Sequence, residues 1–316
     1  MARSRGARRL LLAGTLVAAS VLLSGCSWAD MPRFGWPEGV TPQGERMQYF
    51  WSAAFIAALV VGVGMWGLMF WAFGMYHKRK GSPLYPKQTK ENLPLELIYT
   101  AVPFVLVAIL FYFTVTTENY VLEKSAKAEV TVDVTAFKWN WDFGYQGTQV
   151  AGGEEVHTVG SSEEVPLLVL PANRVIEYHL SSKDVVHSFW VPDFLFKRDV
   201  FPDPDKNNSE NVFQNTISRT GSFVGRCAEL CGTYHSAMNF EVRAVPGEVY
   251  DAYIALRQKQ NPVTGDAYTA AEALAQMQKQ FADECGPSLC APTANTTYPF
   301  NTDREAKSAS LPQAGK

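Results

Sequence analysis

The sequence has no excess of basic residues, and this excludes one large class of function. There are 28 Lys and Arg residues against 31 Asp and Glu residues, which gives a formal net charge of −3. Nowhere do Lys and Arg cluster among aromatic residues in the way that nucleic-acid binding usually needs. We therefore expect no nucleic-acid partner.

Cysteine is also scarce, with five residues in a chain of 316. That number is too small for a disulfide scaffold in a chain of this length. No internal repeat is found either. Each cysteine therefore needs its own explanation, and the five are Cys26, Cys227, Cys231, Cys285 and Cys290.

What the chain does have is three apolar runs, all before residue 118, so its membrane and soluble parts are treated separately. The first run, Leu10 to Leu23, follows several arginines and has the pattern of a secretory signal, so we expect residues 1–25 to be removed as a signal peptide. The adjoining Leu23-Ser-Gly-Cys26 resembles the bacterial lipobox, whose cysteine becomes lipidated and forms the new N-terminus. Ordinary cleavage or an uncleaved anchor is the alternative for Cys26.

The other two apolar runs predict a transmembrane hairpin over residues 47–118. Met47 to Tyr76 and Leu97 to Thr117 contain no charged residue, and about 20 residues are enough to cross the hydrocarbon core. Cytoplasmic loops of membrane proteins carry an excess of Lys and Arg. We therefore place the loop between the two helices on the cytoplasmic side of a bacterial cell membrane. Residues 26–46 and everything after Glu118 then lie on the outer side. The basic residues of this loop are Lys78, Arg79, Lys80, Lys87 and Lys90, next to His77.

After the second helix the hydrophobic period changes from helical to alternating, beginning at Val130. We predict an antiparallel, cupredoxin-like β-sandwich over residues 119–246, with polar insertions at 146–164 and 203–211. Residues 247–316 are predicted to form a C-terminal extension, with helices at 249–260 and 270–282 and a mobile tail after Cys290. The further strand-like runs lie at 167–170, 174–180, 185–191, 212–217, 222–226 and 240–245.

The most informative stretch holds four sulfur and nitrogen side chains at short spacing. Cys227 and Cys231 are followed by His235 and Met238, and His187 lies upstream on a predicted strand. Thiolate, imidazole and a weak thioether are the ligands of copper electron-transfer sites, whereas zinc seldom takes methionine. One alternative is a disulfide, which leaves the histidines and the methionine unexplained. The other is a structural zinc, with Met238 filling space in the core.

The second cysteine indicates two copper ions. A mononuclear blue-copper centre uses one cysteine, so this set has one thiolate too many for it. Two coppers bridged by both sulfurs account for the set, because each metal then has two sulfurs and one histidine. Met238 would bind one metal weakly and a backbone carbonyl the other. One electron shared by two metals changes each bond only slightly, which favours fast electron transfer.

These residues resemble subunit II of cytochrome c oxidase, and the resemblance runs from the first transmembrane helix to about Pro246. The pattern Cys227-x3-Cys231-x3-His235-x2-Met238, with His187 upstream, is similar to the CuA site of that family residue by residue. The resemblance implies that Glu229 supplies the backbone carbonyl and that its side chain reaches a magnesium ion at the interface with subunit I. A carboxylate oxygen suits this hard cation. Without the resemblance, Glu229 would be a solvated surface charge.

The resemblance also assigns a role to an aromatic segment. Ala136-Phe-Lys-Trp139-Asn-Trp141 is similar to the segment where the family accepts electrons from cytochrome c, at the residue that matches Trp139. The alternative role is interface packing, which fits Trp141 better than Trp139. Family members dock cytochrome c through nearby surface carboxylates. Asp142 and Asp184 are candidates for this docking, with ordinary solvated charge as the alternative.

Six further residues receive simpler interpretations. Glu96, at the start of the second helix, resembles the glutamate that guards a proton pathway into subunit I, and its alternative is an interfacial carboxylate without a role. Cys285 and Cys290 lie beyond the part that resembles the family, and outside the membrane a local disulfide is the expectation for them. The remaining histidines lack partner ligands in the sequence and are expected to be ordinary: His77, His157 and His179.

The function implied by the resemblance is electron transfer. Electrons would come from cytochrome c or a membrane-bound c-type cytochrome and pass to haem in subunit I of an aa-type oxidase that also contains subunit III. Oxygen reduction and proton pumping would occur in subunit I, because this chain has no haem ligands of its own for that chemistry. The chain departs from the family pattern in two places: it has Asp203-Pro-Asp where a Pro-Gly turn is commoner, and it has a long C-terminal extension. The electron donor could therefore be unusual, and the oxidase could assemble with a cytochrome bc-type complex.

Two other functions are weighed against this one. A quinol-oxidase-like structural subunit would lack copper, and the intact ligand set argues against it. A copper-delivery lipoprotein would need neither the two helices nor Glu96 nor the Trp139 segment.

Overall fold

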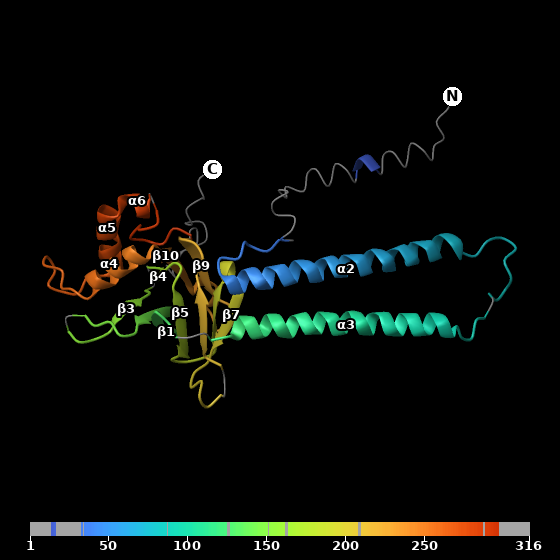
Figure 1. Cartoon of the computed structure of the whole chain (residues 1–316), viewed down its shortest axis with the longest axis horizontal. Helices are drawn as coiled ribbons and strands as arrows, with labels where there is room; N and C mark the ends of the chain where they lie inside the picture. The colour runs from blue at the N-terminus through green and yellow to red at the C-terminus, as the bar shows by residue number, and fades with distance from the viewer. Residues whose placement is uncertain are drawn as a thin grey trace, which may run out of the picture. The chain divides into compact units, whose positions relative to one another are not determined.

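The computed structural model describes residues 14–16, 33, 35–86, 88–124, 127–150, 152–161, 164–207, 210–286 and 288–296. The chain divides into two compact units, Met1–Trp36 and Pro37–Lys316. In the first unit residues 14–16 are helical, and the rest of the predicted signal peptide lies outside the described residues, as does Cys26. The second unit holds two long helices, two β-sheets and three shorter helices (Figure 1).

Two long helices form the hairpin that the sequence predicts. α2 (Pro42–Met75) and α3 (Leu93–Leu122) have 34 and 30 residues, which at about 1.5 Å per residue is more than the ~30 Å hydrocarbon core. They lie side by side (Figure 1). α3 contains the second uncharged run, and α2 contains the first except for Tyr76, its C-cap residue. None of the residues in the most apolar stretch of either helix is buried within the chain, as expected for helices that face lipid or a partner subunit.

The start of α2 is fixed to the soluble domain. Thr41 caps the helix by accepting a hydrogen bond from the Gly44 N–H (2.9 Å), and Pro42 occupies the first turn, where its missing N–H costs nothing. Just before the cap, the Val40 N–H donates to the carbonyl of Asp193 (3.0 Å) in the short helix η2 (Pro192–Phe194). The Val40 carbonyl in turn accepts from the Ser218 N–H (2.8 Å). This end of α2 is therefore the end next to the sandwich.

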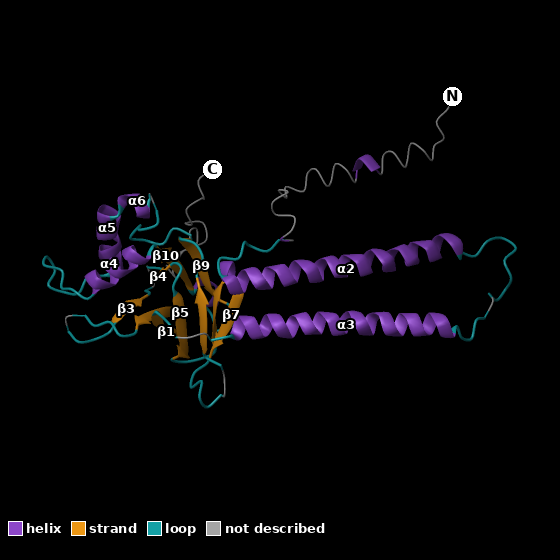
Figure 2. Ribbon diagram, in the orientation of Figure 1, coloured by secondary structure: helices purple, strands orange, loops and turns teal. Residues whose placement is uncertain are grey.

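Ten strands in the described part of the chain form two five-stranded sheets, shown in orange in Figure 2. One sheet has the order β3-β2-β1-β5-β8 and the other β4-β10-β9-β6-β7. The strands are β1 (Val130–Phe137), β2 (Asn140–Tyr145), β3 (Val156–Val159), β4 (Leu167–Pro171), β5 (Val175–Ser182), β6 (His187–Val191), β7 (Phe196–Val200), β8 (Val212–Thr216), β9 (Gly221–Cys227) and β10 (Asn239–Val245).

Seven of these strands confirm the predicted runs to within a few residues. β2, β3 and β7 were not expected, and β3 lies inside the stretch 146–164 that was interpreted as a polar insertion. The expectation of a purely antiparallel sandwich was wrong. β1 pairs in parallel with β5, and β4 pairs in parallel with β10, because the chain passes between the sheets before each pairing. Hydrophobic period indicates which residues face inward but not which strands become neighbours.

The core lies between the two sheets and is rich in aromatic rings. Every second residue of β1 from Val130 onward is buried, as the alternation predicts. Trp141 and Phe143 from β2 meet Phe240 from β10, with ring centroids 5.2 and 5.5 Å apart, and Phe189 of β6 stacks on Phe240 at 4.8 Å. Strands from both sheets are therefore locked together immediately beside the end of β9.

Three helices follow the sandwich, the first two near the places expected and the third, a short one, not expected. They are α4 (Gly247–Arg257), α5 (Ala270–Gln280) and α6 (Ala282–Cys285). Thr269 and Glu272 form a reciprocal capping box that starts α5. The expected disulfide between Cys285 and Cys290 is present, and both of its cysteines are buried.

A buried ion pair on β10 holds the chain beyond this disulfide. Glu241 and Arg243 are both fully buried and bonded to each other. Arg243 also donates to carbonyl oxygens of residues 288–293, and the Glu241 carboxylate accepts from the N–H groups of Asn295 (2.8 Å) and Thr296 (2.7 Å). The prediction of a mobile tail after Cys290 is therefore wrong for residues 291–296. Residues 297–316 lie outside the described residues.

We expect Arg243→Ala to lower the free energy of unfolding by roughly 3–5 kcal/mol, because the Glu241 carboxylate would stay buried without its cation. Arg174→Ala is the matched control. It breaks the more exposed pair with Asp251, and exposed pairs contribute only about 0–1 kcal/mol. Chemical denaturation of the full-length chain in detergent measures both values, and equal losses would contradict the role given to the buried pair.

Candidate metal centre

The loop between β9 and β10 gathers both cysteines, one histidine and the methionine. Cys227 is the last residue of β9, and its N–H donates to the carbonyl of Met238 (3.1 Å), which extends the antiparallel pairing of β9 with β10. Between them the chain passes through Cys231 and then the short helix η3 (His235–Ala237). The hairpin geometry thus returns Met238 to the base of the loop, close to Cys227.

His187 reaches the same loop through strand pairing. It is the first residue of β6, which pairs with β9 so that Phe189 lies opposite Cys227. The Ala228 N–H then donates to the carbonyl of Ser188 (3.1 Å). The His187 side chain is fully buried. Residues 40 positions apart in the sequence therefore meet because two strands of one sheet are neighbours.

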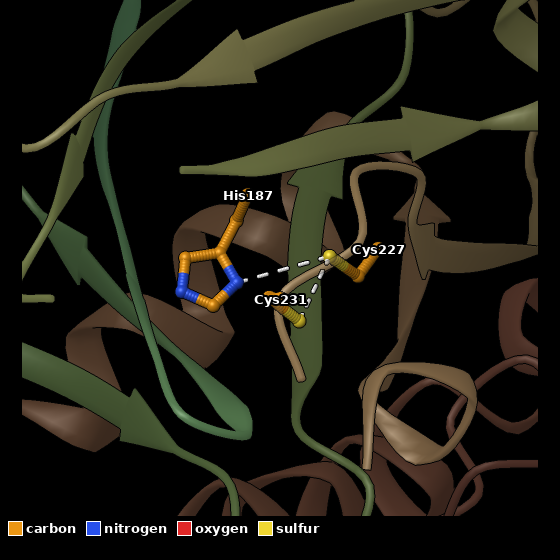
Figure 3. A group of neighbouring side chains, drawn as sticks. All are labelled: His187, Cys227 and Cys231. Atoms are coloured by element: carbon orange, nitrogen blue, oxygen red, sulfur yellow. Dashed lines mark hydrogen bonds between the residues drawn. The ribbon is translucent and has the colours of Figure 1, made fainter. Parts of the chain in front are cut away.

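Three of the side chains form a close cluster, shown in Figure 3. Nδ1 of His187 lies 3.8 Å from Sγ of Cys227, and that sulfur lies 3.8 Å from Sγ of Cys231. All three residues are buried, and their ligand atoms lie within 4.8 Å of one another. Neither thiol is in a disulfide. The disulfide alternative for these two cysteines therefore does not describe this structure.

The other predicted ligands lie around the same two sulfurs. Nδ1 of His235 is 3.6 Å from Sγ of Cys231, and Sδ of Met238 is 3.9 Å from that sulfur. The backbone carbonyl oxygen of Glu229 is 3.3 Å from Sγ of Cys227, while the Glu229 side chain is exposed. One sulfur thus has an imidazole and a carbonyl beside it, and the other has an imidazole and a thioether.

Burial affects the chemistry of the thiols. Desolvation, and after it the neighbouring Cys227 sulfur, raises the pKa of the Cys231 thiol to about 12. The protonated thiol is therefore favoured at neutral pH in the absence of a metal. Because metal ligation requires thiolate, binding must release protons from this site. Metal affinity should consequently fall as the pH falls.

The donor set fits copper better than the alternatives. Two thiols, two imidazole nitrogens, a thioether and a carbonyl oxygen surround one small volume, and soft sulfur with imidazole is the set that copper electron-transfer sites use. A tetrahedral zinc would leave part of this set unused. No hard carboxylate oxygen lies within the cluster of His187, Cys227 and Cys231, so a magnesium or calcium ion does not suit it.

Asp184 holds His187 in position. The Asp184 carboxylate lies 2.8 Å from Nε2 of His187 and accepts from the backbone N–H groups of Lys138 (2.7 Å) and Val185 (2.6 Å). Partial burial raises the pKa of Asp184, but these hydrogen bonds outweigh it and bring the pKa below its ordinary value. An ionised Asp184 keeps the proton of His187 on Nε2, which leaves Nδ1 free to face Cys227.

The indole of Trp139 lies on the cysteine loop. Its Nε1–H donates to the backbone carbonyl of Cys231 (3.2 Å), and its ring packs edge to face with Tyr234, with centroids 4.9 Å apart. Gly232 approaches the same ring, and a side chain there would be strained because the φ angle is +119°. Trp139 is half-buried and lines an open groove of about 300 Å³. One face of the loop is thus linked directly to the surface.

Trp141 has a different position from Trp139. It is fully buried, its Nε1–H donates to the carbonyl of Met238 (3.3 Å), and its ring meets His187 edge to face at 6.3 Å. The alternative role of interface packing does not describe Trp141, because its side chain is buried within this chain. Trp141 supports the base of the loop from inside the core.

The structure pairs several residues that had been considered singly. Asp142 lies 2.8 Å from Nδ1 of His157, and Glu177 lies 2.7 Å from Nε2 of His179, so both histidines have carboxylate partners away from the cysteines. At the start of α3, the Glu96 carboxylate accepts from the Asn92 N–H (2.9 Å) and so helps to cap the helix. Glu96 belongs to the helix hairpin and is not part of the cysteine cluster.

Sequence reasoning missed two residues beside the site. Asp184 was considered only as a docking carboxylate, yet it contacts His187. The one available signal was its position three residues before that histidine. Tyr234 was passed over although it adjoins His235, because nothing in the sequence indicates that its ring packs against Trp139.

The fold and the site define a class of protein: a two-sheet sandwich joined to a pair of membrane-length helices, with a buried cysteine and histidine cluster at one sheet end. Comparison with known proteins agrees with this class. Residues 130–245 match the family described as cytochrome c oxidase subunit II, periplasmic domain.

Relatives extend the match over nearly the whole chain. A probable cytochrome c oxidase subunit 2 of Nocardia farcinica is 45% identical and covers 97% of this chain and 92% of its own length. The cytochrome c oxidase subunit 2 of Mycobacterium tuberculosis is 40% identical, covering 95% of this chain and 91% of that protein.

Among solved structures, the periplasmic domain of subunit II of cytochrome oxidase from Bradyrhizobium japonicum is 27% identical. It covers 42% of this chain and 95% of that domain, with a TM-score of 0.34. On the strength of the sequence relatives, the chain belongs to the cytochrome c oxidase subunit II family, and its His187, Cys227 and Cys231 cluster is consistent with a CuA site.

We expect Asp184→Ala to weaken copper binding by roughly 10–100-fold, the usual cost of losing the partner of a ligating histidine. Asp142→Ala is the matched control, because that carboxylate pairs with His157, which is not near the cysteines. Competition with a copper chelator measures both affinities. Wild-type affinity in Asp184→Ala would show that Asp184 does not position His187.

Proposed function

We propose that this chain is the electron-accepting subunit of its oxidase and holds two copper ions. The ligands would be the side chains of His187, Cys227, Cys231, His235 and Met238, with the backbone carbonyl of Glu229. The observation that carries the proposal is the convergence of these groups on two sulfurs 3.8 Å apart. A copper pair bound here would supply one-electron chemistry with small changes in bond length.

The donor would be cytochrome c, which the names of the relatives print, or a membrane-bound c-type cytochrome. Trp139 is the point on this chain best placed to receive electrons. Its indole is partly open to solvent and is bonded to the carbonyl of Cys231, so one hydrogen bond separates the surface ring from a ligand residue. The open groove beside Trp139 gives a donor access to the ring.

The acceptor would be haem in subunit I of an aa-type oxidase, in a complex that also contains subunit III. Oxygen reduction and proton pumping would take place in subunit I. A cytochrome bc-type complex is a further candidate partner. The cysteine and histidine cluster favours this function over a quinol-oxidase-like subunit without copper, and the two-helix hairpin favours it over a copper-delivery lipoprotein.

Glu229 is proposed to bind magnesium with subunit I. Its carbonyl faces Cys227 while its side chain is exposed, so one residue can serve the cluster and an adjoining subunit at once. Carboxylate oxygen is a suitable ligand for magnesium. Manganese substituted for magnesium in the whole oxidase would report this role, since its spin signal should change in Glu229→Ala.

The membrane arrangement is proposed as well. Residues 1–25 would be a signal peptide, Cys26 a lipidated N-terminus, and the segments 26–46, 119–246 and 247–316 would lie on the outer side of the cell membrane. The basic loop between α2 and α3 supports this orientation. Mass measurement of the mature chain would reveal the lipid. Glu96, at the loop end of α3, would then lie on the cytoplasmic side, where a proton pathway into subunit I could begin.

Replacement of Trp139 tests electron acceptance. We expect Trp139→Ala to slow cytochrome c oxidation by roughly tenfold or more, since loss of a positioned group in an active assembly commonly costs factors of this order. The copper absorption spectrum should not change. Trp190→Ala, at a half-buried tryptophan of β6 that does not line the groove, should oxidise cytochrome c normally. Wild-type oxidation by Trp139→Ala would remove this residue from the electron path.

A further inference from the structure

α2 and α3 enclose a groove that the proposed function does not use. It lies between the two helices and has a volume of about 400 Å³, within the range of roughly 300–1,000 Å³ typical of small-molecule sites. We call it the α2–α3 groove. On the α2 side it is bounded by Ala53, Ala54 and Ala57, and on the α3 side by larger residues such as Leu110 and Phe113. The small alanine side chains leave the space that a larger residue would fill.

The lining of the groove is apolar except at one end. Arg46, Tyr49 and Thr117 line the end next to the sandwich, and no acidic residue lines the groove. The Arg46 guanidinium lies 6.0 Å from the ring centroid of Tyr120 on α3, so it faces the second helix. Within the described part of the chain no carboxylate forms an ion pair with Arg46. The groove therefore has a positive charge at its mouth and a hydrocarbon surface along its length.

The depth of the groove matches one leaflet of a bilayer. Arg46 immediately precedes the uncharged run that begins at Met47, so it lies at the boundary of the hydrocarbon core. From Arg46 to Ala57 is eleven residues, or roughly 16 Å at about 1.5 Å per residue. The lining on α3, from Leu106 to Thr117, has the same length. Half of the ~30 Å hydrocarbon core is about 15 Å.

We propose that the α2–α3 groove binds a phospholipid from the leaflet on the side of the sandwich. One acyl chain lies along the alanines between the helices, and the phosphate of the headgroup contacts Arg46. Three features of the groove favour this ligand. Arg46 lies at the level of the lipid phosphates, and the side chains that line the groove below it are apolar. The groove ends near the middle of the bilayer, where an acyl chain ends. A phosphate-bearing headgroup would pair with the Arg46 guanidinium, which forms no ion pair with a carboxylate among the described residues.

Groove-filling variants of the whole oxidase test this site. Ala54→Leu places a larger side chain in the groove, and Ala58→Leu is the matched control, because Ala58 lies on α2 but does not line the groove. Each oxidase would be stripped of lipid, supplied with phosphatidylglycerol carrying deuterated chains, and weighed by native mass spectrometry. Wild type and Ala58→Leu should retain one labelled lipid that Ala54→Leu loses.

A second variant separates the headgroup from the chain. Arg46→Gln should lose the preference for phosphatidylglycerol over diacylglycerol, which has the same chains without phosphate. Equal lipid retention by Ala54→Leu and wild type would overturn the proposal. So would the loss of subunit I from Ala54→Leu, because the groove would then hold a helix of that subunit and not a lipid. If Arg46→Gln still preferred phosphatidylglycerol over diacylglycerol, the headgroup phosphate would not contact Arg46.

Discussion

The pairing of β6 with β9 is the constraint on which the site depends. It places His187 beside Cys227, and the antiparallel return from β9 to β10 places Met238 at the base of the same loop. The aromatic core formed by Trp141, Phe189 and Phe240 joins these strands to the opposite sheet. His187 and Cys227 are thus held by strands, and the other ligand residues lie in a loop whose two ends are paired to each other. This would limit the rearrangement that a bound metal pair requires on gaining or losing an electron.

Contacts around the ligands connect the buried cluster to its surroundings. Asp184 fixes the proton on His187, Trp139 contacts the carbonyl of Cys231, and Trp141 contacts the carbonyl of Met238. Each contact comes from a residue outside the β9–β10 loop. The ligand residues all belong to the sheet that contains β6, β9 and β10 and to its β9–β10 loop. Residues at β2 and at the end of β1, in the opposite sheet, support them.

Much of the fold and of the site could be predicted from the sequence, for identifiable reasons. Uncharged runs of 20 or more apolar residues are typical of membrane-spanning helices, and both runs are helical in the structure. The spacing of Cys227, Cys231, His235 and Met238 indicated copper because few sites use these residue types together. The alternation along β1 indicated its buried face. Each of these signals depends on residues close together in the sequence, so each can be recognised without a structure.

What could not be predicted depends on contacts between distant segments. The parallel pairing of β1 with β5 depends on the path of the chain between the sheets, and β7 is hidden because its middle residues are charged. The segment 291–296 resembles a disordered tail in composition, yet its backbone satisfies the buried Glu241 and Arg243. Asp184 is a surface carboxylate, and only the fold shows that it also contacts His187.

The proposed site holds two metal ions, and not one, between Cys227 and Cys231. Electron spin resonance of the full-length chain loaded with copper tests it most directly. We expect a signal from one unpaired electron shared equally by two copper nuclei. A signal split by a single copper nucleus, with one copper bound per chain, would contradict this proposal.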